Sequence, residues 1–190
     1  MLERLLIVLT GPVGGGKSTV ASALAERFRE IGHPAAVIDL DVVYCMARQS
    51  DGFDNEDIWS AARRGTAALA DVFFDNGMSV VVVEGGFFTL SELDGLRNHV
   101  TSGSCLRFVT LDVSSKETLR RAQSDPSSDR TVSRSVEVQQ RLYAQFAQAR
   151  PFLQANSLMI DANILSPIDP AQSIVHSILL DESRPLDRSK

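Results

Sequence analysis

"GPVGGGKST", residues 11–19, is the stretch that decides the fold of this chain. It fits the pattern G-x-x-x-x-G-K-[ST] without a mismatch, at Gly11, Gly16, Lys17 and Ser18. The apolar run "RLLIVLT" before it has the length of a buried strand, and "KSTVASALAERFREIG" after it has apolar residues at helical spacing. A strand, a glycine loop and a helix in this order indicate a phosphate-binding loop. The alternative is a flexible glycine-rich turn that only joins the strand to the helix, but both the motif and its flanking elements favour phosphate binding.

The loop predicts a bound nucleoside triphosphate. Glycines let backbone N–H groups point at one anion, and the following helix N-terminus adds more N–H groups and a partial positive charge. We expect Lys17 to reach the β- and γ-phosphates and the Ser18 hydroxyl to bind Mg²⁺. The sequence has no guanine-reading Asn-Lys-x-Asp, so we expect ATP. The predicted nucleotide contacts in the loop are Gly11, Pro12, Val13, Gly14, Gly15, Gly16, Lys17, Ser18 and Thr19.

Four further strands are predicted at residues 34–40, 78–88, 105–113 and 157–162, and helical patterns separate them. Four consecutive valines in the 78–88 segment indicate a strand buried on both faces, as in a parallel sheet. We predict a helix N-cap near Asp54 and a helix from about residue 135 that breaks at Pro151. The expected fold is α/β: a three-layer αβα sandwich of the P-loop NTPase type, with a five-stranded, mostly parallel sheet and a small lid.

Length and composition indicate one domain of ordinary soluble character. The chain has 190 residues, 44% of them hydrophobic, and a formal net charge of −5. We expect a single domain over residues 1–181, a polar lid at about 124–136 and a flexible tail at 182–190. The net charge argues against a nucleic-acid partner, and no apolar run is long enough for a membrane span.

Neither targeting nor metal-binding patterns are evident in the sequence. We find no signal-peptide pattern before the glycine loop and therefore expect a cytoplasmic protein. Cys45 and Cys105 are far apart in sequence and are expected to be reduced, partly buried thiols. The three histidines are scattered, and we expect each on a surface or loop. The oligomeric state stays open.

Carboxylates close two of the predicted strands. Asp39 and Asp41 end the second strand, and Glu84 ends the valine strand. Ligands of such sheets bind beyond the carboxyl ends of the strands, where a carboxylate can accept the proton of an attacking hydroxyl. We predict Asp41 as the catalytic base, with Asp39 as the other candidate; a helix cap is the alternative. Glu84 is predicted to contact a Mg²⁺-bound water or an acceptor hydroxyl, unless it simply emerges into solvent.

Arginines around the polar segment could balance charge on the transferred phosphoryl group. We predict catalytic roles for Arg130 and Arg134 and a nucleotide contact for Arg121. Arg63 and Arg64 could bind an anionic group of the acceptor or could form a solvated helix face. The aromatic residues that could form a wall for the acceptor, or simply pack in the core, are Tyr44, Phe53 and Trp59.

These features resemble the adenylylsulfate kinase family, with gluconate kinases and chloramphenicol phosphotransferases as relatives. The resemblance covers roughly the first half of the chain: the glycine loop, the "VIDLDVV" strand end, and "GFDNEDIWSAARRGTAALADVFFDNGMSVVVV". It implies an ATP- and Mg²⁺-dependent kinase, a carboxylate at the second strand end, and an adenine contact near Asn163. The chain departs from the family pattern after Asp41, where the family has Asn and then Arg and this chain has Val42-Val43-Tyr44.

The function expected from residues and resemblance is transfer of the γ-phosphate of ATP to a hydroxyl of a small molecule. The acceptor stays unidentified. Two alternatives remain: a kinase of polynucleotide 5′-hydroxyls, and an ATP-binding protein or ATPase without kinase activity.

Overall fold

A computed structural model describes residues 4–47, 53–124, 136–163, 166 and 168–182 of the chain. Five parallel strands form one sheet in the order β2-β3-β1-β4-β5. The strands are β1 (Leu5–Thr10), β2 (Ala35–Asp39), β3 (Val80–Glu84), β4 (Cys105–Asp112) and β5 (Leu158–Asp161). The helices are α1 (Lys17–Glu30), α2 (Leu40–Ala47), α3 (Glu56–Asp75), α4 (Leu90–Arg97), α5 (Ser115–Ser124), α6 (Val136–Asn156) and α7 (Ile168–Glu182).

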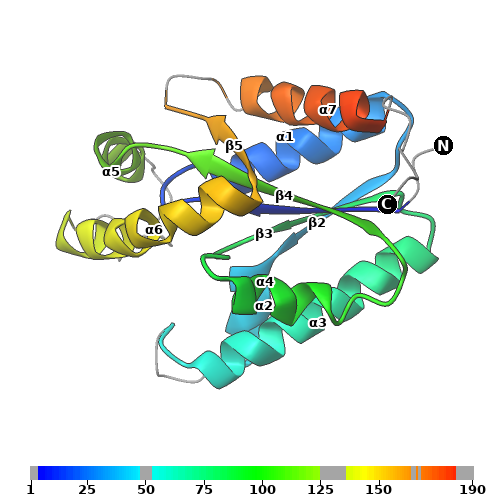
Figure 1. Ribbon diagram of the computed structural model, residues 1–190, viewed down its shortest axis with the longest axis horizontal. Coiled ribbons are helices and arrows are strands. Elements are labelled where there is room, and N and C mark those ends of the chain that lie inside the picture. Colours follow the sequence, from blue (N-terminus) through cyan, green and yellow to red (C-terminus); the bar gives the residue numbers. More distant parts are fainter. Residues whose placement is uncertain (1–3, 48–52, 125–135, 164–165, 167, 183–190) are drawn as a thin grey trace.

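Helices cover both faces of the sheet, which gives three layers (Figure 1). The central strand β1 is buried along its whole length, and its side chains alternate between two cores. Leu5, Ile7 and Leu9 pack with α1 and α7, whereas Leu6 and Val8 pack with α2, α3, α4 and α6. The predicted αβα sandwich and its five-stranded parallel sheet are therefore confirmed.

Two of the expectations for these segments are wrong. The second strand ends at Asp39, and Leu40 begins a helix that was not predicted. The N-cap of α3 is Asn55, the residue next to Asp54, so the N-cap predicted near Asp54 is confirmed: the Asn55 side chain accepts from the backbone N–H groups of Asp57 and Ile58. Both cysteines are free, as expected, but they are exposed instead of partly buried.

Helix α6 continues through Pro151, where a break was predicted. The proline is exposed, so water can satisfy the carbonyl that the missing N–H leaves without its helical partner. On either side of it, Phe146 and Leu153 are fully buried in the same core. Burial of both residues favours one continuous helix over a break.

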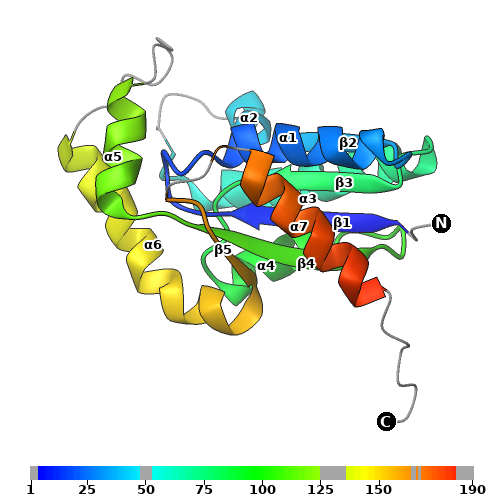
Figure 2. The same ribbon diagram turned by 90° about the horizontal axis from the view of Figure 1, so that it is seen from above.

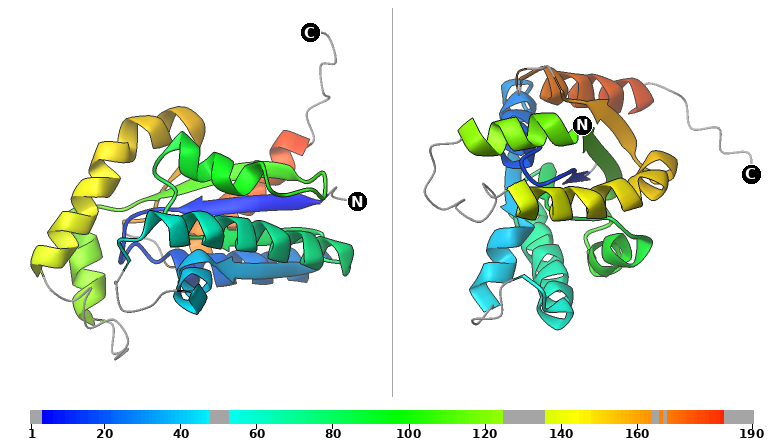
Figure 3. Two further views of the ribbon diagram at one scale, coloured as in Figure 1. Left: turned by 90° about the horizontal axis from the view of Figure 1, so that it is seen from below. Right: turned by 90° about the vertical axis from the view of Figure 1, so that its left-hand side faces the viewer.

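The carboxyl ends of the strands meet at one edge of the sheet, where β1 leads into the glycine loop. In the sheet, β1 lies between β3 and β4. The chain runs from β1 to β2 and then to β3 on one side of β1, and passes from there to β4 and β5 on the other side. Such a switch point is where ligands bind in open α/β sheets. Helices α5 and α6 also lie at this edge (Figures 2 and 3). In the described part of the chain, no helix is both long enough and apolar enough to cross a bilayer.

Candidate active site

The glycine loop has a conformation that only glycine allows at its tightest point. Gly14 has φ +76°, and a Cβ atom there would lie 2.8 Å from the Thr118 carbonyl oxygen of α5. The turn is closed by a hydrogen bond of 3.0 Å from the Gly15 N–H to the Pro12 carbonyl. Gly16 then caps α1 without a side-chain hydrogen bond, which leaves the first N–H groups of the helix available to an anion.

Glu84 is buried at the end of β3, with only 3% of its surface exposed. Its neighbours in the sheet are Leu9 of β1 and Asp39 of β2. Burial raises the pKa of the Glu84 carboxyl to about 7, against the opposing effects of the Lys17 charge and a hydrogen bond with the Ser18 side chain; the charges of Asp39 and Asp41 raise it further. The alternative that Glu84 emerges into solvent is wrong.

Four sequence-predicted groups therefore influence the pKa of Glu84 at this edge of the sheet: Lys17, Ser18, Asp39 and Asp41. In the described part of the chain, no three His, Cys, Asp or Glu side chains are grouped to hold a metal ion by themselves. Mg²⁺ bound with nucleotide phosphates needs no such cage, because it takes one or two protein oxygens and keeps several waters. The pair of Ser18 and Glu84 oxygens fits that smaller requirement.

The two aspartates after β2 differ in their surroundings. Asp39 is partly buried, and its Oδ1 accepts hydrogen bonds from the Asp41 N–H at 2.8 Å and the Val42 N–H at 3.3 Å. Asp39 therefore caps α2, the role that was the alternative to catalysis. Asp41 lies exposed in the first turn of that helix.

Gly85 explains how α2 lies so close to the end of β3. A Cβ atom at Gly85 would lie 2.8 Å from the Cβ atom of Leu40, the residue between the two aspartates. The missing side chain lets Leu40 pack, fully buried, against the chain that leaves Glu84. This close approach brings the start of α2 and its aspartates to the end of β3.

Arg121 links the glycine loop to the end of β5 by hydrogen bonds. Its guanidinium donates to the Gly15 carbonyl at 2.9 Å and to the Ala162 carbonyl at 2.6 Å. Asn163, the next residue, accepts a 2.8 Å hydrogen bond from the Ser114 N–H through its side chain. Arg121 and Asn163, both predicted to contact the nucleotide, therefore lie together beside the loop.

Glu117 holds this arginine in place. Its carboxylate accepts from the side chains of Arg120 and Arg121, each at 2.7 Å. Hydrogen bonds from Arg120, and then from Arg121, lower the pKa of the Glu117 carboxyl to about 2. The carboxylate is therefore charged at neutral pH and can orient both guanidinium groups.

Arg63 is buried, so the solvated helix face proposed as an alternative for it is wrong. Its guanidinium contacts Glu56 at 2.7 Å and Glu92 at 3.4 Å. Glu92 also accepts from the backbone N–H groups of Phe88 and Thr89, which fixes the start of α4. Arg64, in contrast, is exposed.

The three aromatic residues considered as an acceptor wall form one cluster. The ring of Tyr44 lies with its centroid 4.1 Å from that of Trp59 and 5.2 Å from that of Phe53. Tyr44 is fully buried, whereas Phe53 is about half exposed. The cluster joins α2 to the start of α3, so packing accounts for much of it.

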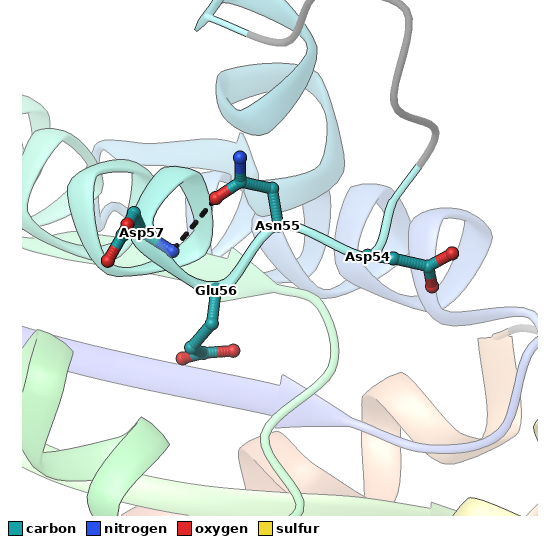
Figure 4. A pocket seen from close by; sticks show the side chains of 4 residues that line it. All are labelled: Asp54, Asn55, Glu56 and Asp57. Atoms are coloured by element: carbon teal, nitrogen blue, oxygen red, sulfur yellow. Dashed lines mark hydrogen bonds between the residues drawn. The ribbon is translucent and has the colours of Figure 1, made fainter.

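An open hollow of about 330 Å³ lies at the N-terminus of α3, lined by Asp54, Asn55, Glu56 and Asp57 (Figure 4). None of the predicted nucleotide contacts lines it. Arg130 and Arg134, the two predicted catalytic arginines, lie outside the described residues. One buried polar side chain beside the glycine loop, Gln139 of α6, was not identified from the sequence.

A parallel sheet with a glycine loop after its central strand, followed by a helix, defines a P-loop nucleotide-binding fold. The chain belongs to the adenylylsulphate kinase family, whose sequence profile matches residues 3–125. It is 37% identical over 80 residues to the adenylyl-sulfate kinase of Rippkaea orientalis, a match that covers 42% of this chain and 44% of that protein. The chain thus matches less than half the length of this relative.

Solved structures share the fold over nearly the whole chain. The APS kinase of Mycobacterium tuberculosis, in complex with AMPPNP and APS, has a TM-score of 0.63 at 20% identity, covering 94% of this chain and 99% of that one. The shikimate kinase of Acinetobacter baumannii, in complex with shikimate, has a TM-score of 0.62 at 21% identity, covering 94% and 95%.

Proposed function

We propose that this protein is an ATP- and Mg²⁺-dependent kinase that transfers the γ-phosphate to a hydroxyl group of a small molecule. The observation that carries the proposal is the position of Glu84, buried at the end of β3, where the side chains of Lys17 and Ser18 lower the pKa of its carboxyl. A buried carboxylate at a strand end is costly unless a cation or hydrogen bonds compensate it. Nucleotide-bound Mg²⁺ would supply that compensation.

The roles of the residues follow from phosphoryl-transfer chemistry. Lys17 and the N–H groups of the glycine loop would balance charge on the β- and γ-phosphates and hold the γ-phosphate in line with the acceptor. Mg²⁺, when bound, would neutralise charge on the phosphate oxygens. Asp41 would orient the attacking hydroxyl and accept its proton as the bond to phosphorus forms. Arg130 and Arg134 are proposed to stabilise the same transition state.

Two observations support an acceptor without a sulfate or phosphate group. Val42 and Val43 follow Asp41 where the resembling family has Asn and then Arg. Arg63, one of two cations on the described parts of α2 and α3, already contacts Glu56 and Glu92. Both reduce the positive charge offered to an anionic acceptor on this side of the sheet.

A panel of hydroxyl compounds with γ-labelled ATP tests the proposal. It contains adenylylsulfate, gluconate, shikimate, chloramphenicol and a 5′-hydroxyl oligonucleotide, together with a reaction without acceptor. We expect label in one small molecule, dependence on Mg²⁺, and loss of transfer in the Lys17→Ala variant. Hydrolysis that no acceptor stimulates would favour an ATPase, and label in the oligonucleotide alone would favour a polynucleotide kinase.

A further inference from the structure

Gln139 is the most conspicuous polar side chain that the proposed mechanism does not use. It lies in the first turns of α6 and has only 3% of its surface exposed. Both atoms of its amide, Nε2 and Oε1, lack a hydrogen-bond partner among the described residues. Buried side-chain amides are nearly always hydrogen-bonded, so this one calls for a partner that the described residues do not provide.

The amide lies against the glycine loop. Its Nε2 is 3.4 Å from the place where a Cβ atom of Gly14 would be, next to the Thr118 carbonyl of α5. Helices α5 and α6 pack together at the edge of the sheet where the loop lies (Figure 3). A side chain larger than hydrogen at Gly14 would meet both the carbonyl and the amide.

We propose that Gln139 is a nucleotide-binding residue: its Nε2 donates a hydrogen bond to the phosphate chain of the nucleoside triphosphate held by the glycine loop. A phosphate oxygen is an acceptor for which a buried N–H donor is well suited, and the hydrogen bond is strengthened by the negative charge. The inference rests on the proposed nucleotide site and adds to it a contact from α6, which lies outside the family match over residues 3–125.

An isosteric substitution separates a ligand contact from a structural brace. Gln139→Met keeps the length of the side chain but removes its polar atoms. Because the amide has no partner among the described residues, the melting temperature of the nucleotide-free variant should stay within about 2 °C of wild type or rise. The Kd for Mg²⁺–AMPPNP, measured by calorimetry, should increase about 10- to 100-fold, as expected for a lost hydrogen bond to a charged group.

Two further variants complete the experiment. Gln140→Met is the matched control, because Gln140 is the exposed neighbour on the same helix, and its Kd should equal that of wild type. Gln139→Glu places a carboxylate beside the phosphates and should weaken binding more than Gln139→Met does. Unchanged Kd in Gln139→Met, with or without a lower melting temperature, would overturn the inference and leave Gln139 a packing residue.

A measurement on the wild type does not depend on the folding of any variant. The side-chain amide resonances of Gln139, in protein labelled with ¹⁵N, should shift when Mg²⁺–AMPPNP binds, whereas those of Gln140 should stay in place. If AMPPNP binds and the Gln139 resonances do not move, only the inference fails. If the wild type binds no nucleotide, the proposed function fails as well.

Discussion

Replacing Glu84 with glutamine should change how the stability of the protein depends on pH. In the folded protein, burial raises the pKa of the Glu84 carboxyl from 4.5 to about 7. Between about pH 4.5 and pH 7, Glu84 is therefore protonated in the folded state and ionised in the unfolded state. Because the folded state is the one that holds more protons, the free energy of unfolding falls as pH rises through this interval.

The size of the effect follows from the same two values. The interval from 4.5 to about 7, at about 1.4 kcal/mol per pH unit, corresponds to about 3 kcal/mol. Glu84→Gln has the shape of the protonated side chain and cannot ionise. The variant should therefore match wild type near pH 4.5 and be more stable by about 3 kcal/mol at pH 8, a difference of roughly 6–12 °C in melting temperature.

Urea unfolding of the nucleotide-free proteins at pH 5, 6, 7 and 8 measures this directly. Glu117 serves as the internal contrast, because its pKa is lowered to about 2 and its contribution is lost only as pH falls below about 4.5. The reasoning would be refuted if the free energy of unfolding changed with pH equally in wild type and in Glu84→Gln between pH 5 and 8. The same variant should bind Mg²⁺–ATP more weakly than wild type, because it lacks the carboxylate proposed to face the metal.

Four more substitutions, two of them with a matched control, test the other side chains of the site. Asp41→Asn should lower the rate of phosphoryl transfer about 10²–10⁴-fold with nearly normal folding. Asp39→Asn keeps a capping oxygen for α2 and should fold normally. If Asp39→Asn shows the loss of rate and Asp41→Asn does not, Asp39 is the base. Arg121→Met should weaken ATP binding about tenfold by calorimetry, because it frees the Gly15 carbonyl, whereas the control Arg120→Met, at a 65% exposed side chain, should not. Arg63→Met should lower stability by about 1–3 kcal/mol in urea, and Arg64→Met by less than about 0.5 kcal/mol; equal losses would contradict the ion pairs of Arg63.

The nucleotide side of the site could be predicted from sequence because its signals are local. Residues 11–19 carry the whole motif, and the strand before it and the helix after it follow directly along the chain. The four valines of β3 are buried on both faces because a parallel sheet covered on both sides makes every position apolar. The acidic strand ends could be placed near the loop by the same rule, since parallel strands end at one edge.

Helix α2 was not predicted because several of its residues favour a strand. "LDVVYCMA" contains two adjacent valines and a tyrosine, residues that favour strands, in a segment of only eight residues. What stabilises the helix is not visible in that segment: the Asp39 side chain caps it, and Leu40 and Tyr44 are fully buried against other elements. Tertiary packing therefore decides this element against its local preference.

Gln139 and Gln140 are identical in type and adjacent in sequence, yet one is buried beside the glycine loop and the other is exposed. Helical spacing places Gln139 on the buried face of α6, seven residues before Phe146 and fourteen before Leu153. That this part of the face meets the glycine loop depends on how α5 and α6 pack, which the spacing does not show. A buried glutamine is detected only when the partners of its amide are counted in three dimensions.

The three-dimensional partners of Arg63 and Arg64 also decide whether these arginines can bind the acceptor. From the sequence, two adjacent arginines could bind a negatively charged group of the acceptor. An arginine attracts such a group only if nearby carboxylates do not already compensate its charge. Arg63 contacts Glu56, seven residues away, and Glu92, 29 residues away, and the second partner reaches it only because α4 packs on α3. The pair thus offers one exposed cation, Arg64, and one that joins two helices, so the arginines alone do not favour a sulfated or phosphorylated acceptor.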